Sequence, residues 1–487
     1  MSKVTAVIDI GSNSARMAIF RRTSRYGFSL IFETKSKVRI SSGCYENGGI
    51  LQEDSINRAL CALKDFVRLA KNHQARKLFC VATSAVRDAP NKNEFISLVK
   101  KETNLQIKVI DGEKEAFFGA VACCNLLHKK DGITIDIGGG STECALIENG
   151  KIKELISLSI GTIRLKELFF DSKIDIKKLR AFIQKEIDKI PDSFVSNNVF
   201  GIGGTIRALS KMIMKKEKYK INAIHGYEFD PRDYMDFFKN IYSSDIKKLK
   251  DFNVPVERED NIRGGALIFS MLLERFCSNL VITSGVGVRE GVFLSDLLRR
   301  QNYVFPNNIN PSYRSVLDRF VLDKRAQNNV KKNVLKLFNV LCEVCNIDKK
   351  YLFHLQNAAS FTKIGNYLGF YSSHEHGAYF LLNALNYGYS HIDRAIISLL
   401  VKYSNKKIPK DDEIVHLDKY MPDIRILQYL SFILSVSEVL SLVNATFDFS
   451  FKNNTLYIAS NDDFYILKEK INSLHKPDSM DIEFINI

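Results

Sequence analysis

The sequence has no run of about 18 apolar residues, the length at which a segment becomes a candidate for crossing a bilayer as a helix. Its opening residues, MSKVTAVIDIG, also lack the charged start and the long apolar core of a secretory signal. These two absences argue against a membrane-spanning chain and against an exported one. We therefore expect a cytoplasmic protein without a membrane partner.

A repeated cysteine motif is also missing. Cys342 and Cys345 form a C-x-x-C within the helix-like run VKKNVLKLFNVLCEVC, and no second Cys pair or His pair accompanies it. A zinc site needs further Cys or His ligands, so this pair alone does not predict one. Most of the nine cysteines instead fall in apolar patterns, as expected for reduced, buried thiols: Cys61, Cys80, Cys123, Cys124, Cys144 and Cys277.

Composition provides material for more than one hydrophobic core. With 487 residues, of which 45% are hydrophobic, the chain has room for roughly three or more ordinary domains. Lys and Arg exceed Asp and Glu, and the net charge is +15. This excess favours a polyanionic partner such as nucleic acid, a membrane surface or polyphosphate. The alternative is a basic background shared by the proteins of the cell.

The chain contains one strand–turn–strand unit twice. Residues 4–20, VTAVIDIGSNSARMAIF, and residues 132–148, GITIDIGGGSTECALIE, both read as an apolar strand ending in Ile-Asp-Ile-Gly, a small-residue turn and a second strand. Asp9 and Asp136 occupy the same place in the two units. Glycine lets backbone N–H groups approach a phosphate closely, whereas a plain β-turn needs no ligand. Because each turn leads to a strand and not to a helix, Walker and Rossmann loops are excluded.

The repeat continues beyond the turns. A run with helical spacing and then a short buried strand follow each set of strands: LQEDSINRALCALKDFVRLAKNH with KLFCVATSAVR in the first half, and DIKKLRAFIQKEIDKI with NVFGIGGTIRAL in the second. Two αβ domains that face each other across a cleft would bring both turns, each with its Asp, to one phosphate chain. We therefore predict a duplicated α/β architecture around a phosphate-binding cleft.

Six segments in the amino-terminal part of the chain, in this order, resemble the exopolyphosphatase/guanosine pentaphosphate phosphohydrolase (Ppx/GppA) family: VIDIGSNS, VATSAVRDA, IDGEKEA, IDIGGGSTE, GIGGTIRAL and GVGVREGV. The resemblance implies two RNase H-like domains of the actin, Hsp70 and sugar-kinase superfamily around a cleft, at residues 1–124 and 125–304. It also implies the reaction class, which is hydrolysis of a terminal phosphoanhydride.

Hydrolysis of a phosphoanhydride needs a base that takes the proton of the attacking water. The resemblance places this catalytic base at Glu115 in VIDGEKEAFFGAVA, in preference to Glu113. On a helix that starts near Gly112, Glu115 would lie in the first turn and point into the cleft while Phe117 and Phe118 pack. A carboxylate at a helix start is otherwise a capping group that does no chemistry.

Three acidic residues lie on or beside the two turns, and carboxylates next to a polyanion require a cation between them. We predict that this cation is Mg²⁺ and that Asp9, Asp136 and Glu143 hold it. Because Mg²⁺ keeps several of its waters, these carboxylates would act either directly or through water molecules.

The remaining predicted contacts are phosphate donors. The turns would supply backbone N–H groups and hydroxyls from Gly11, Ser12, Asn13, Ser14, Gly138, Gly139, Gly140, Ser141 and Thr142. The resemblance matches Arg87 to a phosphate contact, and Arg16 and Arg289 are further candidates because the guanidinium fork suits phosphate oxygens. Gly204 and Thr205 fall where nucleotide-binding members of the superfamily hold adenosine or its phosphates, unless they only close the cleft.

From residue 305 the pattern changes to helices, and we predict a third domain over 305–487 that ends in a small α+β subdomain. Family members carry a helical domain like that of HD phosphohydrolases here. The expected His-Asp pair falls on Thr362 and Lys363, and a later expected histidine falls on Ser404. We therefore predict a degenerate HD-like domain without hydrolase chemistry, which lengthens a substrate channel or forms a dimer interface. Positive charge there would come from Lys402, Lys406 and Lys407.

The function predicted first is a Mg²⁺-dependent phosphohydrolase. It would remove the terminal phosphate of inorganic polyphosphate, of pppGpp to give ppGpp, or of both, by in-line attack of water with Glu115 as general base. The alternatives are a sugar-kinase-like or Hsp70-like ATPase that uses the same turns, and a sensor that binds polyphosphate or ppGpp without turnover. We further expect a homodimer that requires no nucleic acid.

Overall fold

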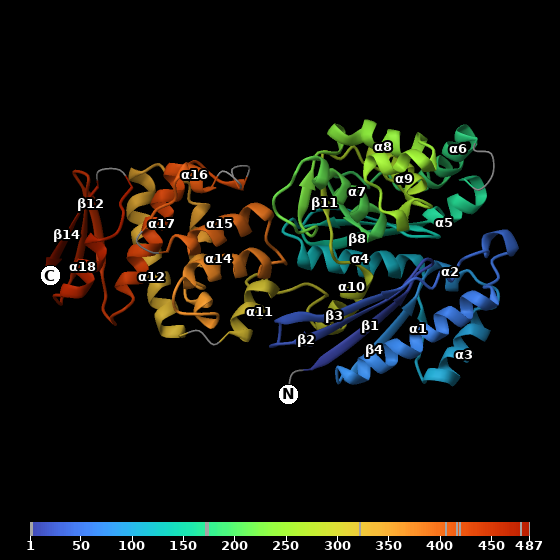
Figure 1. The fold of residues 1–487 in the computed structure, drawn as a ribbon, viewed down its shortest axis with the longest axis horizontal. Coiled ribbons are helices and arrows are strands. Elements are labelled where there is room, and N and C mark those ends of the chain that lie inside the picture. Colours follow the sequence, from blue (N-terminus) through green and yellow to red (C-terminus); the bar gives the residue numbers. More distant parts are fainter. Residues whose placement is uncertain are drawn as a thin grey trace. The chain divides into compact units, whose positions relative to one another are not determined.

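The computed structural model describes residues 3–170, 175–320, 323–404, 407–414, 417, 420–477 and 480–486. The chain divides into two compact units, Met1–Ser315 and Val316–Ile487, and each is described by itself. Figure 1 shows two sheets with their helices in unit 1, and a helical region followed by a small sheet in unit 2. The further division of unit 1 at residues 124 and 125 stays a prediction.

The first half of unit 1 is built on a five-stranded sheet with the order β3-β2-β1-β4-β5. Its elements are β1 (Val4–Ile10), β2 (Ala15–Arg22), β3 (Phe28–Ser36), η1 (Tyr45–Asn47), α1 (Glu53–Asn72), β4 (Lys77–Ala82), α2 (Ser84–Arg87), α3 (Lys92–Thr103) and β5 (Lys108–Val109). β1, β2 and β3 form an antiparallel meander, and β4 joins β1 in parallel. Helix α1 buries Ala59, Leu63, Phe66 and Ala70 on one face, at the spacing that the sequence predicts.

The second half of unit 1 repeats this arrangement on a six-stranded sheet with the order β10-β11-β9-β6-β7-β8. The last helix of the first half, α4 (Gly112–Leu126), leads into it. The elements of the second half are β6 (Gly132–Ile137), β7 (Thr142–Glu148), β8 (Lys151–Leu158), α5 (Thr162–Leu165), η2 (Lys166–Phe170), α6 (Ile176–Ile187), β9 (Asn198–Ile202), α7 (Gly203–Lys216), β10 (Tyr227–Phe229), η3 (Pro231–Tyr234), α8 (Met235–Ser243), η4 (Ile246–Phe252), η5 (Val256–Arg258), α9 (Ile262–Phe276), β11 (Leu280–Thr283) and α10 (Val288–Leu297). β6, β7 and β8 form the second meander, and β9 pairs with β6 in parallel as β4 pairs with β1. The predicted duplication is therefore present in the fold.

Two helices connect the halves by crossing over. α4 precedes the second sheet and packs on β6, β7 and β8, whereas α10 follows the second sheet and packs on β1 and β2. The two helices also pack against each other, and Figure 1 shows the pair between the two sheets. Gly291 permits the close crossing, because a Cβ there would collide with the carbonyl oxygen of Phe118. Each half of unit 1 thus completes the core of the other.

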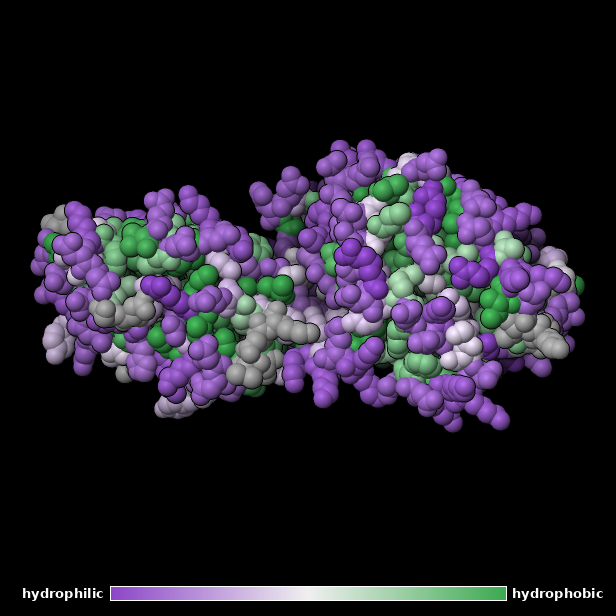
Figure 2. Space-filling model, turned by 90° about the horizontal axis from the view of Figure 1, so that it is seen from above, coloured by the Kyte–Doolittle hydropathy of each residue, from purple (hydrophilic) through white to green (hydrophobic). Residues whose placement is uncertain are grey.

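No helix among the described residues is long and apolar enough to cross a membrane. The face shown in Figure 2 is mostly hydrophilic, with hydrophobic side chains in scattered patches. Many large apolar side chains are buried, among them Phe20, Phe28, Phe200, Phe269 and Phe293. This distribution is that of a protein with packed hydrophobic cores.

Unit 2 is mostly helical and ends in a sheet with the order β12-β13-β14. Its elements, with a helix at the unit boundary, are α11 (Pro311–Arg319), α12 (Lys324–Val344), α13 (Tyr351–Ala359), η6 (Ile364–Tyr367), α14 (Ser373–Ala384), α15 (His391–Lys402), α16 (Asp411–Ile414), α17 (Ile424–Leu440), β12 (Asp448–Lys452), β13 (Thr455–Ser460), α18 (Tyr465–Asn472) and β14 (Asp481–Asn486). The predicted hairpin is β12 with β13, and Asn453 and Asn454 in its turn have positive φ. β14 adds to β13 in parallel, which the sequence did not predict.

The positions where HD phosphohydrolases would have metal ligands make other contacts here. Thr362 is buried, and Lys363 forms an ion pair with Glu438. Ser404 donates its hydroxyl to a backbone carbonyl three residues earlier. Across the described residues, no group of three or more His, Cys, Asp or Glu is placed to hold a metal ion. Of the lysines predicted to add charge, Lys406 lies outside the described residues.

The packing of α10 on the first sheet can be tested at Phe293, whose ring stacks on Phe20 with centroids 4.4 Å apart. We expect Phe293→Ala to lower the free energy of unfolding of unit 1 by about 3–5 kcal/mol, because it leaves a cavity between helix and sheet. Denaturant titration measures this change. Val195→Ala, at a position that is 64% exposed, is the control and should cost less than about 1 kcal/mol. Equal costs at the two positions would contradict this packing.

Candidate active site

The two hairpins of unit 1 have matching turns. In the first, Asp9 lies opposite Arg16, and the N–H of Gly11 donates to the carbonyl of Ser14 at 3.2 Å. In the second, Asp136 lies opposite Glu143, and the N–H of Gly138 donates to the carbonyl of Ser141 at 3.0 Å. Equivalent backbone hydrogen bonds close both turns, so the two sequence repeats also have the same turn geometry.

The turns face each other closely. A Cβ added at Gly139 would lie 2.6 Å from the Cβ of Ser12, so only glycine allows this approach without a shift. The hydroxyl of Ser12 lies 3.2 Å from that of Ser84, which begins α2. Both hairpins therefore present their turns to one shared space.

That space is a cleft with about 900 Å³ of empty volume. The predicted site residues that line it are Asp9, Gly11, Ser12, Asn13, Ser14, Arg16, Glu115, Asp136, Gly138, Gly139, Gly204, Thr205 and Arg289. The sequence did not single out several further polar lining residues: Thr83, Ser84, Thr162, Arg207, Arg258, Asn261 and Glu290. Of these, Arg207 lies inside the quoted segment GIGGTIRAL, whereas Arg258 belongs to no recognisable motif.

Five predicted residues do not line the cleft: Arg87, Gly140, Ser141, Thr142 and Glu143. Thr142 is fully buried and donates its hydroxyl to the carbonyl of Ile160 at 2.7 Å. The prediction that this hydroxyl faces phosphate is therefore not met in the structure, because the hydroxyl joins the start of β7 to the segment that follows β8. The hydroxyl of Ser141 is likewise directed to Glu143.

Several helices begin at the cleft. β9 ends at Ile202 and runs directly into α7, while Gly287 and Val288 begin α10 and Glu115 lies in the first turn of α4. Parallel strands end at the same edge of a sheet, so the helices that follow them start side by side. The positive dipole ends of these helices favour an anion in the cleft.

Four arginines line the same space: Arg16, Arg207, Arg258 and Arg289. Burial, then the neighbouring Arg16 and Arg289, lower the pKa of Arg207 to about 10. Burial and mutual repulsion also lower the pKa of Arg16 and of Arg258. These guanidinium groups are close enough to repel one another, so an anion placed among them would stabilise their charged forms.

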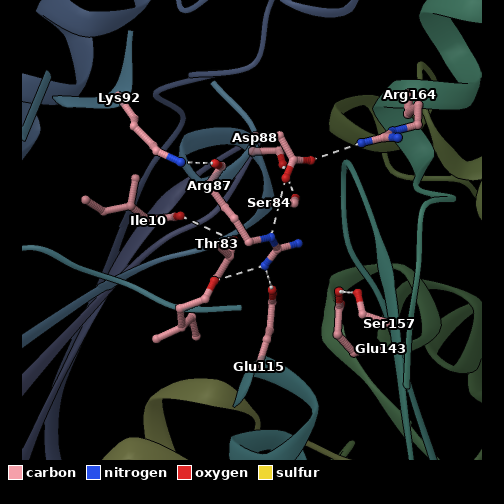
Figure 3. A network of polar contacts seen from close by, with 12 residues as sticks. Ile10, Thr83, Ser84, Arg87, Asp88, Lys92, Glu115, Glu143, Ser157 and Arg164 are labelled. Carbon is pink, nitrogen blue, oxygen red and sulfur yellow. Dashed lines mark hydrogen bonds and ion pairs between the residues drawn. The ribbon is translucent and has the colours of Figure 1, made fainter. Parts of the chain in front are cut away.

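Glu115 is tied to Arg87. The Nη1 of Arg87 donates to a carboxylate oxygen of Glu115 at 3.2 Å and to the carbonyl of Ile110 at 3.1 Å. Figure 3 shows Glu115 rising from its helix toward this guanidinium, with Asp88 on the other side. Asp88 in turn accepts from Arg164 of the second half at 3.2 Å. Arg87 therefore contacts Glu115 and does not line the cleft, whereas the resemblance implies a contact between Arg87 and phosphate.

Glu115 is not the residue that caps α4, because Asp111 fills that position. The side chain of Asp111 accepts the N–H of Lys114 at 2.6 Å and caps α4. Burial, then the nearby Glu143, raise the pKa of Glu115 well above its ordinary value, while Arg87 opposes this rise. Glu113, the other acid in the motif, is exposed and does not line the cleft.

The three carboxylates predicted to hold Mg²⁺ differ in their surroundings. Burial raises the pKa of Asp9, and its buried Oδ1 has no hydrogen-bond partner among the described residues. Burial likewise raises the pKa of Asp136 to about 6 and that of Glu143 to about 7. Glu143 accepts the hydroxyl of Ser157 at 2.9 Å, to one side of Arg87 and Glu115 in Figure 3. An orphaned oxygen on Asp9 fits a hydrated cation that is shared with substrate phosphates, as Mg²⁺ usually is.

These features define a class of protein: an actin-like fold in which two phosphate-binding hairpins face one cleft. A family model described as the Ppx/GppA phosphatase family matches residues 18–300. A second model, described as Ppx/GppA phosphatase domain III, matches residues 310–465. The chain therefore belongs to the Ppx/GppA phosphatase family.

Curated relatives agree with this assignment at modest identity. The chain is 30% identical over 300 residues to a bifunctional 3-dehydroquinate synthase/phosphatase of Fusobacterium nucleatum, which covers 57% of this chain and 44% of that protein. The match thus spans less than half of that longer relative. A guanosine-5'-triphosphate,3'-diphosphate pyrophosphatase of Photobacterium profundum is 24% identical over 414 residues, which are 82% of this chain and 80% of that protein.

Solved structures share the fold of unit 1. A Ppx/GppA family member from Aquifex aeolicus has a TM-score of 0.54 and 30% identity, covering 62% of this chain and 99% of that one. An exopolyphosphatase from Cytophaga hutchinsonii has a TM-score of 0.56 and 24% identity, covering 61% of this chain and 98% of that one. The structure from Cytophaga hutchinsonii indicates a shared fold and, at this identity, carries no argument about activity.

The contact between Arg87 and Glu115 predicts a pH effect. Removing the guanidinium in Arg87→Gln should raise the pKa of Glu115 further, because a nearby positive charge favours the carboxylate. The acid limb of the pH–rate profile for phosphatase activity should then move to higher pH. Arg164→Gln is the matched control, since it removes the neighbouring pair with Asp88 and leaves Glu115 untouched. An acid limb that stays in place in Arg87→Gln would contradict this role.

Proposed function

We propose that this protein is a phosphohydrolase that removes the terminal phosphate from a linear phosphate chain. The observation that carries the proposal is that Glu115 lines the same cleft as both glycine-containing turns. The substrate would be inorganic polyphosphate, pppGpp, which gives ppGpp, or both. Relatives with names of both kinds support this substrate class: a guanosine-5'-triphosphate,3'-diphosphate pyrophosphatase and an exopolyphosphatase.

The turns and arginines would hold the phosphates. Ser12 and Gly139 line the cleft together with the starts of α7 and α10, and their backbone N–H groups would donate to the phosphate oxygens. Arg16 and Arg289 lie on the first-half side of that space: Arg16 on β2 opposite Asp9, and Arg289 within reach of Glu33 at 3.2 Å. Such preorganised donors stabilise charge without having to reorganise during the reaction.

Glu115 would act on the water. In the proposed step the water oxygen forms a bond to the terminal phosphorus while Glu115 accepts the water proton. The bond from that phosphorus to the bridging oxygen breaks, and its electron pair remains on the penultimate phosphate. A carboxylate with a raised pKa is a stronger base than an ordinary one, which suits this task near neutral pH. Arg87 would hold the carboxylate at the angle that the attack needs.

We propose that Mg²⁺ assists this reaction and that Asp9 and Asp136 hold it, directly or through water. The ion would neutralise charge on the phosphate oxygens and so permit carboxylates beside a polyanion. Glu143 is the cross-strand partner of Asp136 and does not line the cleft, so it would support the metal site without binding the ion directly. A cytoplasmic location, a homodimer and independence from nucleic acid complete the proposal.

The base assignment predicts a loss of turnover without a loss of binding. We expect Glu115→Gln to lower the rate of phosphate release by roughly 10²- to 10⁴-fold, because the amide cannot accept the proton of the water. Phosphate release measures the rate, and calorimetry with a substrate measures binding. Glu113→Gln is the matched control on the same helix turn and should keep its activity. A full rate in Glu115→Gln would move the base to another carboxylate.

The metal assignment predicts a change in Mg²⁺ dependence. Asp136→Asn removes one negative charge from the cleft, so it should raise the Mg²⁺ concentration needed for half-maximal activity. Titration of activity with Mg²⁺ measures this shift. Glu148→Gln, at an exposed position near the far end of β7, serves as the control. An unchanged Mg²⁺ requirement in Asp136→Asn would contradict the assignment.

A further inference from the structure

Unit 1 contains a second hollow, at the other end of β1 from the cleft. Asp9 near the end of β1 faces the cleft, whereas Lys3, Val4 and Thr5 at its start line this hollow, which has about 1320 Å³ of empty volume. About 17 Å of strand lies between Val4 and Asp9. The other lining residues are Arg22, Arg25, Tyr26, Arg76, Lys77, Phe293, Asp296, Leu297, Arg299, Arg300 and Gln301. We call this site the basal hollow.

The charge of the basal hollow is one-sided. Seven of the described residues that line it are Lys or Arg, and Asp296 is the acid among them. Asp296 pairs with Lys77 at 2.7 Å and with Arg299 at 3.1 Å. Within the described part of the chain, no ion pair with an acid is found for Lys3, Arg22, Arg25 or Arg300. The single carboxylate thus leaves these four positive charges without an acidic partner among the described residues.

The clustering of positive charge in the basal hollow does not stabilise the fold. The cations come from separate stretches of chain at the start of β1, the end of β2, the start of β4 and the end of α10. Like charges that converge from separate elements repel one another, so their placement costs stability. The Nε of Arg22 is buried and has no acceptor among the described residues. An anion bound in the hollow would supply both the missing charge and the missing acceptor.

The aromatic rings at the basal hollow are already engaged. The guanidinium of Arg25 lies over the ring of Tyr26, 5.0 Å from its centroid, and Phe305 meets the same ring edge-on at 6.2 Å. Phe293 is buried in its stack on Phe20. Proteins that bind single-stranded nucleic acid offer free aromatic faces to the bases, whereas the two aromatic side chains that line this hollow, Tyr26 and Phe293, already contact other side chains. A polyanion without bases therefore fits it better than nucleic acid does.

We propose that the basal hollow binds a segment of an inorganic polyphosphate chain, as a second site that does no chemistry. The identity of this polyanion rests on the proposed function, whereas the anion site itself rests on the lining charges. A substrate of few phosphates held in the cleft is too short to reach past β1. The basal hollow would therefore add affinity for long chains and none for short ones.

The test compares two double variants of the full chain in the Glu115→Gln background, where the proposed base is absent. Arg25→Glu with Arg300→Glu reverses two exposed charges of the basal hollow, and Lys100→Glu with Lys129→Glu reverses two exposed charges elsewhere on unit 1. Both change the net charge equally, and all four positions are exposed, so folding should be kept. The probes are labelled long-chain polyphosphate, labelled tripolyphosphate and single-stranded DNA of matched charge, with affinity read from anisotropy.

We expect the hollow variant to bind long-chain polyphosphate about tenfold more weakly than the control variant, with less than about twofold change for tripolyphosphate. Equal weakening in both variants, or equal weakening for both polyphosphates, would overturn the proposal. Tighter binding of the DNA, lost in the hollow variant, would also overturn it in favour of a nucleic-acid site. This test measures binding and does not depend on turnover. Wild-type protein that binds long chains through the hollow but releases no phosphate would contradict only the proposed function.

Discussion

Buried charge of both signs around one cleft is the constraint on which the rest of unit 1 depends. Asp9, Asp136 and Glu115 are held where burial raises the pKa of each, and burial also lowers the pKa of Arg16 and Arg207. Ionised groups in such surroundings are costly unless partners or a ligand compensate them. A phosphate chain with its cation would compensate both sets at once.

The crossed helices α4 and α10 make this arrangement possible. α4 carries Glu115 from the first half of unit 1 onto the second sheet, and α10 carries Arg289 from the second half back onto the first. Each helix therefore delivers one functional side chain to the space between the two hairpins. The two turns belong to different halves, so the spacing between them and Glu115 depends on how the halves pack.

Much of this fold is predictable from the sequence because it rests on local pattern. The repeated Ile-Asp-Ile-Gly strand ends predict both hairpins, and the apolar spacing of α1 predicts its buried face. Arg258 could not be found in this way, because it reaches the cleft from the short helix η5, which carries no motif. The roles of Arg87 and Thr142 depend on partners distant in sequence, Glu115 and Ile160, which no local pattern reveals.

The central claim is that the two hairpins and Glu115 form one site for a linear phosphate chain. The most direct measurement is phosphate release from long-chain polyphosphate, pppGpp and ATP, assayed in parallel with Mg²⁺. The account predicts release from long-chain polyphosphate, from pppGpp or from both, at a rate well above that from ATP. Turnover of ATP alone would contradict it and favour a kinase-like ATPase, and binding without release from any of the three would favour a sensor.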